Sequence, residues 1–98
     1  MHKVAILIPT TSHNRNEWVT IKDTYLFHSV KSFLLSKGHY DDNVYRIYVG
    51  FDEDDRIFAN KEQQNELKRF ESVFQNLSIH FYSMKDIPKG HLTKMWNH

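Results

Sequence analysis

The sequence contains no cysteine, only two prolines and three glycines, and no long hydrophobic run. Without cysteine the chain has no disulfide, no thiolate-ligated zinc or iron–sulfur centre and no thiol nucleophile. The longest apolar run, Val4 to Ile8, is far shorter than the roughly 20 apolar residues that span a bilayer, and it runs into Pro9 too early for a secretory signal. We therefore expect a protein without a membrane span, located in the cytoplasm.

An excess of charge of either sign is also absent. Lys and Arg total 13 and Asp and Glu total 12, so the formal net charge is +1. Binding to nucleic acid by phosphate neutralisation alone requires a marked positive charge, so we expect no nucleic-acid partner. The 98 residues are 40% hydrophobic and 26% charged, which is typical of one small globular domain.

Three apolar segments separated by two amphipathic segments predict an α/β fold. The run Val4 to Ile8 is continuous, as in a parallel strand covered on both faces. Residues 46–51 alternate between apolar and polar, and residues 78–84 form the third expected strand. Helical connections imply parallel strands and right-handed crossovers. We expect a three-stranded parallel, Rossmann-like half-sheet in the order 3-2-1, with helices on both faces.

Capping residues predict where the helices begin and end. A first helix over 21–37 follows the capping-box-like Thr20 and stops at Gly38. Asn60 is expected to cap a second helix, and a third helix is expected to begin near Thr93. The buried stripe predicted for the second helix comprises Leu67, Phe70, Phe74 and Leu77.

The three expected strands end at Thr10, Asp52 and Met84, and these ends would meet at one edge of the sheet. Ligands bind at this carboxyl edge in doubly wound folds. In the loop after the first strand, backbone N–H groups, hydroxyls and Arg15 suit a diphosphate. The alternative is an ordinary polar surface loop. The chain has neither a G-x-G-x-x-G nor a Walker A pattern, which argues against a dinucleotide oxidoreductase or a P-loop kinase.

The acidic run 52–55 has three interpretations. Asp52 could accept a hydrogen bond from a ribose hydroxyl or a base, the Asp-x-Asp pattern could bind a divalent metal, or the run could be an exposed turn before a helix. Asp55 lies further from the strand and is expected to be a solvated turn charge.

The other chemistry-bearing residues give weaker signals. No two of the seven histidines have the spacing of a zinc helix, so we expect no histidine-based metal site and ordinary surface positions for His28 and His80. No Ser or Thr lies in a G-x-S-x-G elbow, and no catalytic residue is assigned. We expect packing roles rather than base stacking for Trp18, Tyr25, Tyr45, Tyr48 and Tyr82.

Three segments together resemble a known family. They are residues 3–12 followed by Arg15, residues 48–55, and residues 89–97. Their sequences and order are similar to the N-terminal portion of GT-A-fold, family 2-like nucleotide-sugar glycosyltransferases, of the kind found in large DNA viruses and microbes. The resemblance covers almost the whole chain, which would then be a single incomplete GT-A-like domain over 1–98.

The resemblance implies a role for each matched position. Thr10, Thr11 and Arg15 would line the nucleotide pocket, and Asp52 would contact the base or ribose of a UDP-type donor. Lys94 and Asn97 would face the nucleotide from the other side. The family's Mn²⁺- or Mg²⁺-binding Asp-x-Asp and its catalytic base come later in its fold, outside this chain. We therefore expect a donor-binding portion that does not catalyse transfer alone.

Two alternatives to an enzyme stay open, a non-catalytic nucleotide-binding module and an assembly module. The first strand bears on the second of these. It would be a sheet edge that is apolar on both faces and carries no charge, bulge or proline within Val4 to Ile8. Edge strands of monomeric proteins are normally blunted by such features. We therefore expect self-association, or a partner, at the first strand.

Overall fold

A three-stranded parallel sheet forms one layer of the molecule. The structure, a computed structural model, describes residues 3–38 and 43–86. Strands β1 (Lys3–Pro9), β2 (Val44–Phe51) and β3 (Leu77–Ser83) pair in the order β1-β2-β3 with all neighbours parallel. The predicted α/β class and strand order are therefore confirmed, and β1 is an edge strand. Both β2 and β3 begin earlier than the sequence predicts, at Val44 and Leu77.

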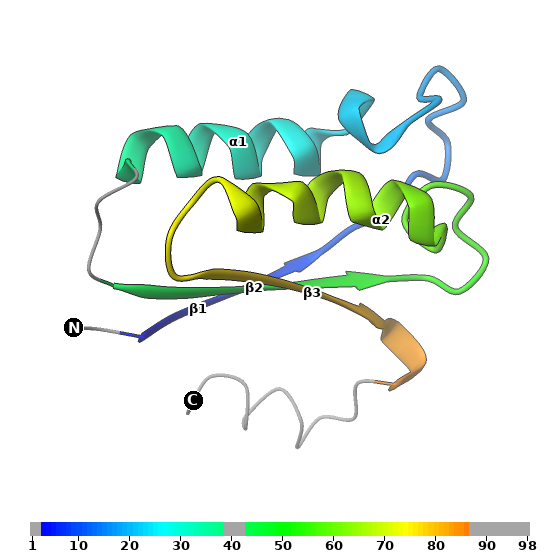
Figure 1. The fold of residues 1–98 in the computed structure, drawn as a ribbon. Coiled ribbons are helices and arrows are strands. Elements are labelled where there is room, and N and C mark those ends of the chain that lie inside the picture. The colour runs from blue at the N-terminus through cyan, green and yellow to red at the C-terminus, as the bar shows by residue number, and fades with distance from the viewer. Residues whose placement is uncertain (1–2, 39–42, 87–98) are drawn as a thin grey trace.

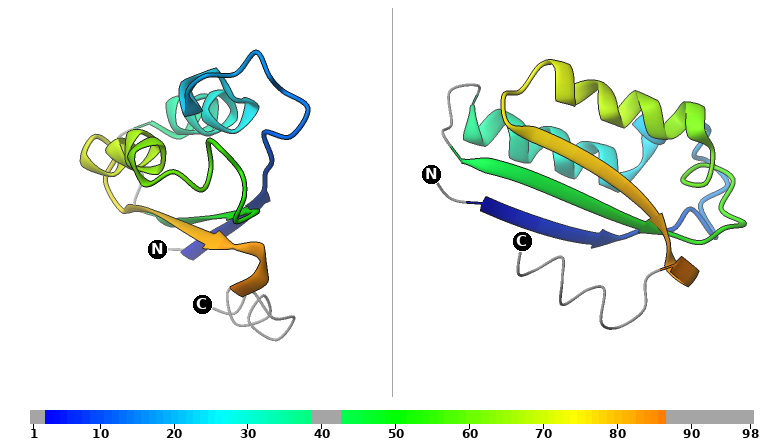
Figure 2. Two further views of the ribbon diagram at one scale, coloured as in Figure 1. Left: turned by 90° about the vertical axis from the view of Figure 1, so that its right-hand side faces the viewer. Right: turned by 60° about the horizontal axis from the view of Figure 1, so that its bottom comes forward.

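The second layer consists of α1 (Tyr25–Lys37) and α2 (Lys61–Lys68). Both helices cover the same face of the sheet (Figures 1 and 2). The prediction of helices on both faces is therefore wrong for the part of the chain that the structure describes. The reason is topological: successive right-handed crossovers that step in one direction, from β1 to β2 to β3, place both helices on one side. The third helix, expected from Thr93, lies outside the described residues.

The first helix begins later than predicted because two capping threonines follow each other. Thr20 precedes a short 3-10 helix, η1 (Ile21–Asp23), whose Asp23 carboxylate accepts a hydrogen bond from the Thr20 amide at 3.0 Å. Thr24 then adopts an extended conformation, and its hydroxyl accepts from the Phe27 amide at 3.2 Å. Thr24 is therefore the N-cap of α1. The predicted end is confirmed: Gly38 follows α1 with φ 77°, which residues with a side chain rarely adopt.

The second helix begins as predicted and is shorter than the apolar stripe suggests. Asn60 accepts hydrogen bonds from the amides of Glu62 and Gln63. The α-helix ends at Lys68 and continues as the 3-10 helix η2 (Arg69–Ser72). A further short 3-10 helix, η3 (Met84–Asp86), follows β3. Leu77 is buried as expected, but it is the first residue of β3 rather than part of the helix.

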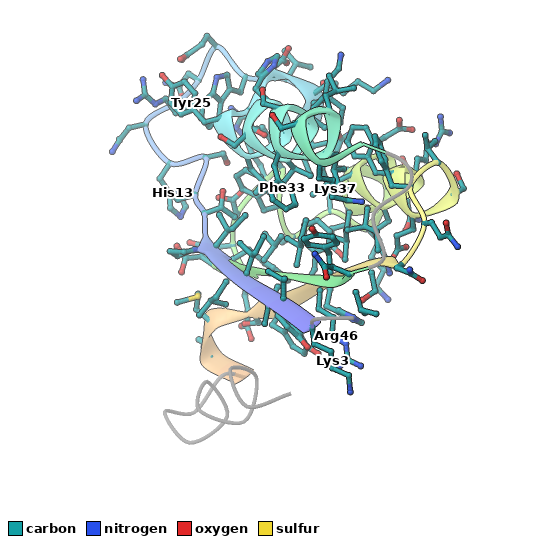
Figure 3. All side chains as sticks on the ribbon, turned by 90° about the vertical axis from the view of Figure 1, so that its left-hand side faces the viewer. Lys3, His13, Tyr25, Phe33, Lys37 and Arg46 are labelled. Carbon is teal, nitrogen blue, oxygen red and sulfur yellow. The ribbon has the colours of Figure 1, made fainter. Side chains whose placement is uncertain are left out.

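The hydrophobic core lies between the two layers. Figure 3 shows Phe33 directed from α1 toward the sheet, where its ring lies 5.5 Å from the ring of Tyr45. Ile57 and Phe58, from the connection between β2 and α2, are almost completely buried, a role that the sequence analysis did not assign to them. The fully buried centre also includes Ile21, Leu34, Val49, Leu67 and Ile79.

The face of the sheet opposite α1 and α2 carries an aromatic group. His80 stacks on Tyr48 with ring centroids 5.3 Å apart, and it is half-buried rather than the ordinary surface residue that we expected. Burial lowers the pKa of His80; the nearby Glu71 carboxylate opposes this effect, and the charges of Lys68 and Arg46 add to it. Within the described ranges, no helix is both long enough and apolar enough to cross a membrane.

Candidate nucleotide-binding site

A pocket of about 490 Å³ opens at the carboxyl edge of the sheet. The amide of Thr10 donates to the carbonyl of Gly50 at 2.9 Å, which fixes the start of the β1 loop beside β2. As a result Thr10, Thr11 and Asp52, which the sequence analysis singled out, line the same pocket. The remaining lining residues come from β1, α1 and the connecting segments: Ile8, Pro9, Trp18, Tyr25, Leu26, Ser29, Phe58 and Met84.

One wall of this pocket is aromatic. Trp18 is buried and meets Tyr25 edge to face, with ring centroids 5.1 Å apart. Tyr25 is 62% exposed, so the prediction that it serves core packing is wrong. The Arg15 guanidinium lies over both rings, 5.6 Å from the centroid of Trp18 and 5.2 Å from that of Tyr25. Arg15 is therefore held against the aromatic wall by cation–π contacts instead of lining the pocket itself.

A second hollow of about 440 Å³ adjoins the first and is lined mainly by polar residues. Asp52 and Met84 line both hollows, so the two form neighbouring parts of one edge. The other residues of the second hollow are His13, Glu53, Asp54, Ser83 and Lys85. Lys85 pairs with Glu53 at 3.3 Å, and the Ser83 hydroxyl donates to Glu53 at the same distance. These contacts connect the loop after β2 to the end of β3.

His13 joins two of the four acidic residues. Its Nε2 lies 3.5 Å from a carboxylate oxygen of Asp52 and 3.5 Å from one of Asp54. The three ligand atoms lie within 4.8 Å of one another, and all three residues are exposed. Protonated, His13 would be a cation between two carboxylates; neutral, it would complete a donor set suited to a divalent ion. This grouping was not predicted from the sequence, because the Asp-x-Asp pattern and the histidine spacing were considered separately; a metal on the acidic run stays one of the three interpretations left open.

Asp55 has a structural role instead of the solvated one that we expected. Its side chain is 2% exposed and accepts four hydrogen bonds, from the Ser12 amide and hydroxyl and from the amides of Ile57 and Phe58. Burial opposes its charge, but the hydrogen bonds, led by that of the Phe58 amide, outweigh this and hold the pKa of Asp55 below its usual value. Asp55 thus joins the two loops that form the pocket.

Arg56 reinforces the same junction. Its guanidinium donates to the backbone carbonyl of Arg15 at 2.6 Å. The Thr11 hydroxyl accepts from the amide of His13 at 3.1 Å, which shapes the loop between Thr10 and Arg15.

Of the six residues predicted to bind a nucleotide, three line the pocket and Arg15 lies against its wall. Lys94 and Asn97 lie outside the described residues.

Comparisons with known proteins identify no relative of this chain. No family model, no curated protein and no solved structure matches the chain. The likeness to GT-A glycosyltransferases therefore stays a prediction from the sequence. What the structure shows is a small α/β fold in which two loops at the carboxyl edge of a parallel sheet, together with the start of α1, line an open aromatic pocket beside an acidic hollow.

Proposed function

We propose that this chain binds the nucleotide of a nucleotide sugar, of UDP type, as the N-terminal donor-binding portion of a GT-A-like glycosyltransferase. The observation that carries the proposal is that Thr10 and Asp52, from loops after adjacent strands, line one pocket together with Trp18 and Tyr25. Doubly wound folds bind ligands at this edge. A volume of about 490 Å³ suits a small-molecule ligand of this size.

The residues that line the two hollows indicate which part of the nucleotide each hollow would hold. The planar base packs against the aromatic wall of the first, where Tyr25 is accessible. Asp52, at the boundary, accepts a hydrogen bond from the ribose or the base. The diphosphate extends past Asp52 toward the second hollow, where Lys85, which is paired with Glu53, is a cationic lining residue. Arg15, at the rim, is a further nearby cation.

A divalent ion belongs to this proposal because a diphosphate carries concentrated negative charge. For the complete enzyme we expect Mn²⁺ or Mg²⁺ on ligands outside this chain. Within the chain, His13, Asp52 and Asp54 offer a nitrogen and two carboxylates, a set that suits such an ion and would let it neutralise phosphate charge. No catalytic residue is assigned here, so we propose that the chain binds the donor without transferring the sugar alone.

The proposal is tested by titrating the full chain with UDP, GDP, CDP and ADP and with the corresponding nucleotide sugars. Calorimetry with and without Mn²⁺ measures affinity, and amide chemical shifts recorded with Mg²⁺ locate the ligand. Because the pocket is open on one side, we expect a Kd on the order of 1 mM, or about −4 kcal/mol. The shifts should centre on Thr10, Thr11, Tyr25 and Asp52. Shifts confined to other surfaces, or no binding by any nucleotide, would refute the proposal.

A further inference from the structure

We propose, independently of nucleotide binding, that the outer edge of β1 pairs with β1 of a second copy of this chain, antiparallel, to give one continuous sheet. Backbone geometry identifies the groups available for pairing. The Thr10 amide donates to Gly50 of β2, and hydrogen bonds of a parallel strand alternate in direction along the chain. Even-numbered positions of β1 therefore face β2. Ala5 and Leu7 direct their N–H and C=O groups to the open edge.

At the opposite edge of the sheet, one outward donor of β3 is occupied by a charged side chain, so β1 is the less protected edge among the described residues. The outward amide of Ile79, in β3, donates to the carboxylate of Glu71 at 2.7 Å. A charged side chain that occupies a strand's outer donor is a recognised means of preventing edge-to-edge association. Among the described residues, no side chain does the same for Ala5 or Leu7. The only charged residue of β1 is Lys3, at its first position.

An incompletely filled apolar groove lies beside this open edge. It measures about 140 Å³ and is lined by residues of β1, α1 and β2: Ile6, Ile8, Ser29, Val30, Phe33 and Ile47. Val4, Ile6 and Ile8 are each only partly buried, although they pack against the core. Helix α1 therefore leaves part of the β1 side chains uncovered. Covering them removes apolar surface from water, which favours association.

The pattern of β1 suits a second copy in particular. A two-fold axis beside Ile6 places Ala5 opposite Leu7 of the second copy, and both residues have outward-directed backbone groups, so each pair exchanges two hydrogen bonds. Ile6 then meets its own counterpart on the helix-covered face. The two Lys3 side chains lie at opposite ends of the joined strands, so their charges do not meet. An interface of this self-complementary kind closes as a dimer.

Sedimentation and backbone amide exchange of the full chain, from low-micromolar to near-millimolar concentration, test the proposal. We expect a monomer–dimer equilibrium in which the amides of Ala5 and Leu7 become protected as the dimer forms. The Ile79 amide should be protected at every concentration because Glu71 holds it within the monomer. A monomer throughout the range would overturn the proposal. So would protection of Ala5 and Leu7 that does not depend on concentration, which would mean that the chain covers this edge itself.

Proline at position 5 removes one outward donor without touching the bonds to β2, and proline is tolerated at such edge positions. We expect Ala5→Pro to weaken dimerisation at least about tenfold, since hydrogen bonds of the pairing are lost. Ala5→Ser keeps the amide and is the matched control, expected to dimerise like the wild type. Circular dichroism verifies that both variants fold. An Ala5→Pro variant that folds and dimerises normally would contradict edge pairing by β1.

The protected edge provides a test in the opposite direction. Glu71→Ala frees the outward amide of Ile79 and should let sheets join at both edges, so that species larger than the dimer form. Glu71→Gln retains an acceptor oxygen and should remain close to the wild type. Because this experiment creates association instead of abolishing it, a failure to fold cannot mimic the expected result. An unchanged oligomer distribution in folded Glu71→Ala would contradict the role of edge protection.

Discussion

The carboxylate of Asp55 accepts hydrogen bonds from both the backbone amide and the hydroxyl of Ser12, at 2.6 and 2.7 Å, across 43 positions of sequence. This contact fixes the loop after β1 against the loop after β2. Those two loops contribute Thr10, Thr11 and Asp52 to the same pocket. The shape of the candidate site therefore depends on a buried pair that does not itself line the pocket.

Removal of the Asp55 carboxylate should destabilise the fold. We expect Asp55→Ala to lower the free energy of unfolding by about 3 kcal/mol, because the amides of Ser12, Ile57 and Phe58 lose a charged acceptor inside the protein. The melting temperature should fall by at least about 10 °C. Asp54→Ala is the matched control, since Asp54 is exposed and its loss should cost less than about 0.5 kcal/mol. Equal losses would show that the Asp55 hydrogen bonds contribute little.

The same carboxylate should make stability depend on pH. The folded protein holds the pKa of Asp55 below its ordinary value of 3.8, so the unfolded chain takes up the proton first as pH falls. The stabilisation is complete above that ordinary value and is lost as pH falls through the folded pKa. Denaturant unfolding of the wild type and Asp55→Asn at several pH values measures it. The difference in free energy of unfolding between the wild type and the variant should be constant at neutral pH and should become smaller below about pH 4. A difference that stays constant down to pH 2 would contradict this role of Asp55.

Asp52 should matter more to nucleotide binding than Asp54. Both are exposed, but Asp52 lines both hollows and Asp54 only the acidic one. In the absence of metal we expect Asp52→Asn to weaken nucleotide affinity about tenfold, as loss of a charged acceptor would, and Asp54→Asn to change it less than about twofold. Calorimetry provides the affinities. Equal losses that appear only with Mn²⁺ would show that both residues act through a bound ion and not by direct contact with the nucleotide.

Tyr25 should contribute more to nucleotide binding than to the stability of the fold. Its ring forms part of the pocket wall and is 62% exposed, so a base can stack on it at little cost to the core. We expect Tyr25→Ala to weaken nucleotide affinity about tenfold, within the range of base–aromatic stacking, and to lower the free energy of unfolding by about 1 kcal/mol through the lost contacts with Trp18 and Arg15. Tyr25→Phe keeps the ring and should bind like the wild type. If Phe weakens binding as much as Ala does, the hydroxyl and not the ring contacts the ligand.

The sequence alone determined the class and order of the fold. The continuous apolar run of β1, the Asn60 cap and the Gly38 stop are local signals, and each depends on conformational preferences of a few neighbouring residues. The position of Thr10 and Asp52 at one edge also followed, because parallel strands must end on the same side. The start of α1 was predicted wrongly because Thr20 and Thr24 are both suitable N-cap residues. The local sequence pattern does not indicate which of the two begins the α-helix.

Only the tertiary structure decided which polar residues are buried and which aromatic residues are exposed. Asp55 and Asp54 are neighbours of one type, yet the first faces Ser12 in the interior and the second faces water beside His13. Tyr25 is at the start of an amphipathic helix, yet its ring lines a pocket instead of the core. Such outcomes depend on contacts between segments far apart in the chain, and sequence periodicity reports only which face a residue occupies. The physical reason is that the burial of a side chain depends on how the sheet and the helices pack together. Helix capping and the alternation of residues along a strand depend only on a few neighbouring residues.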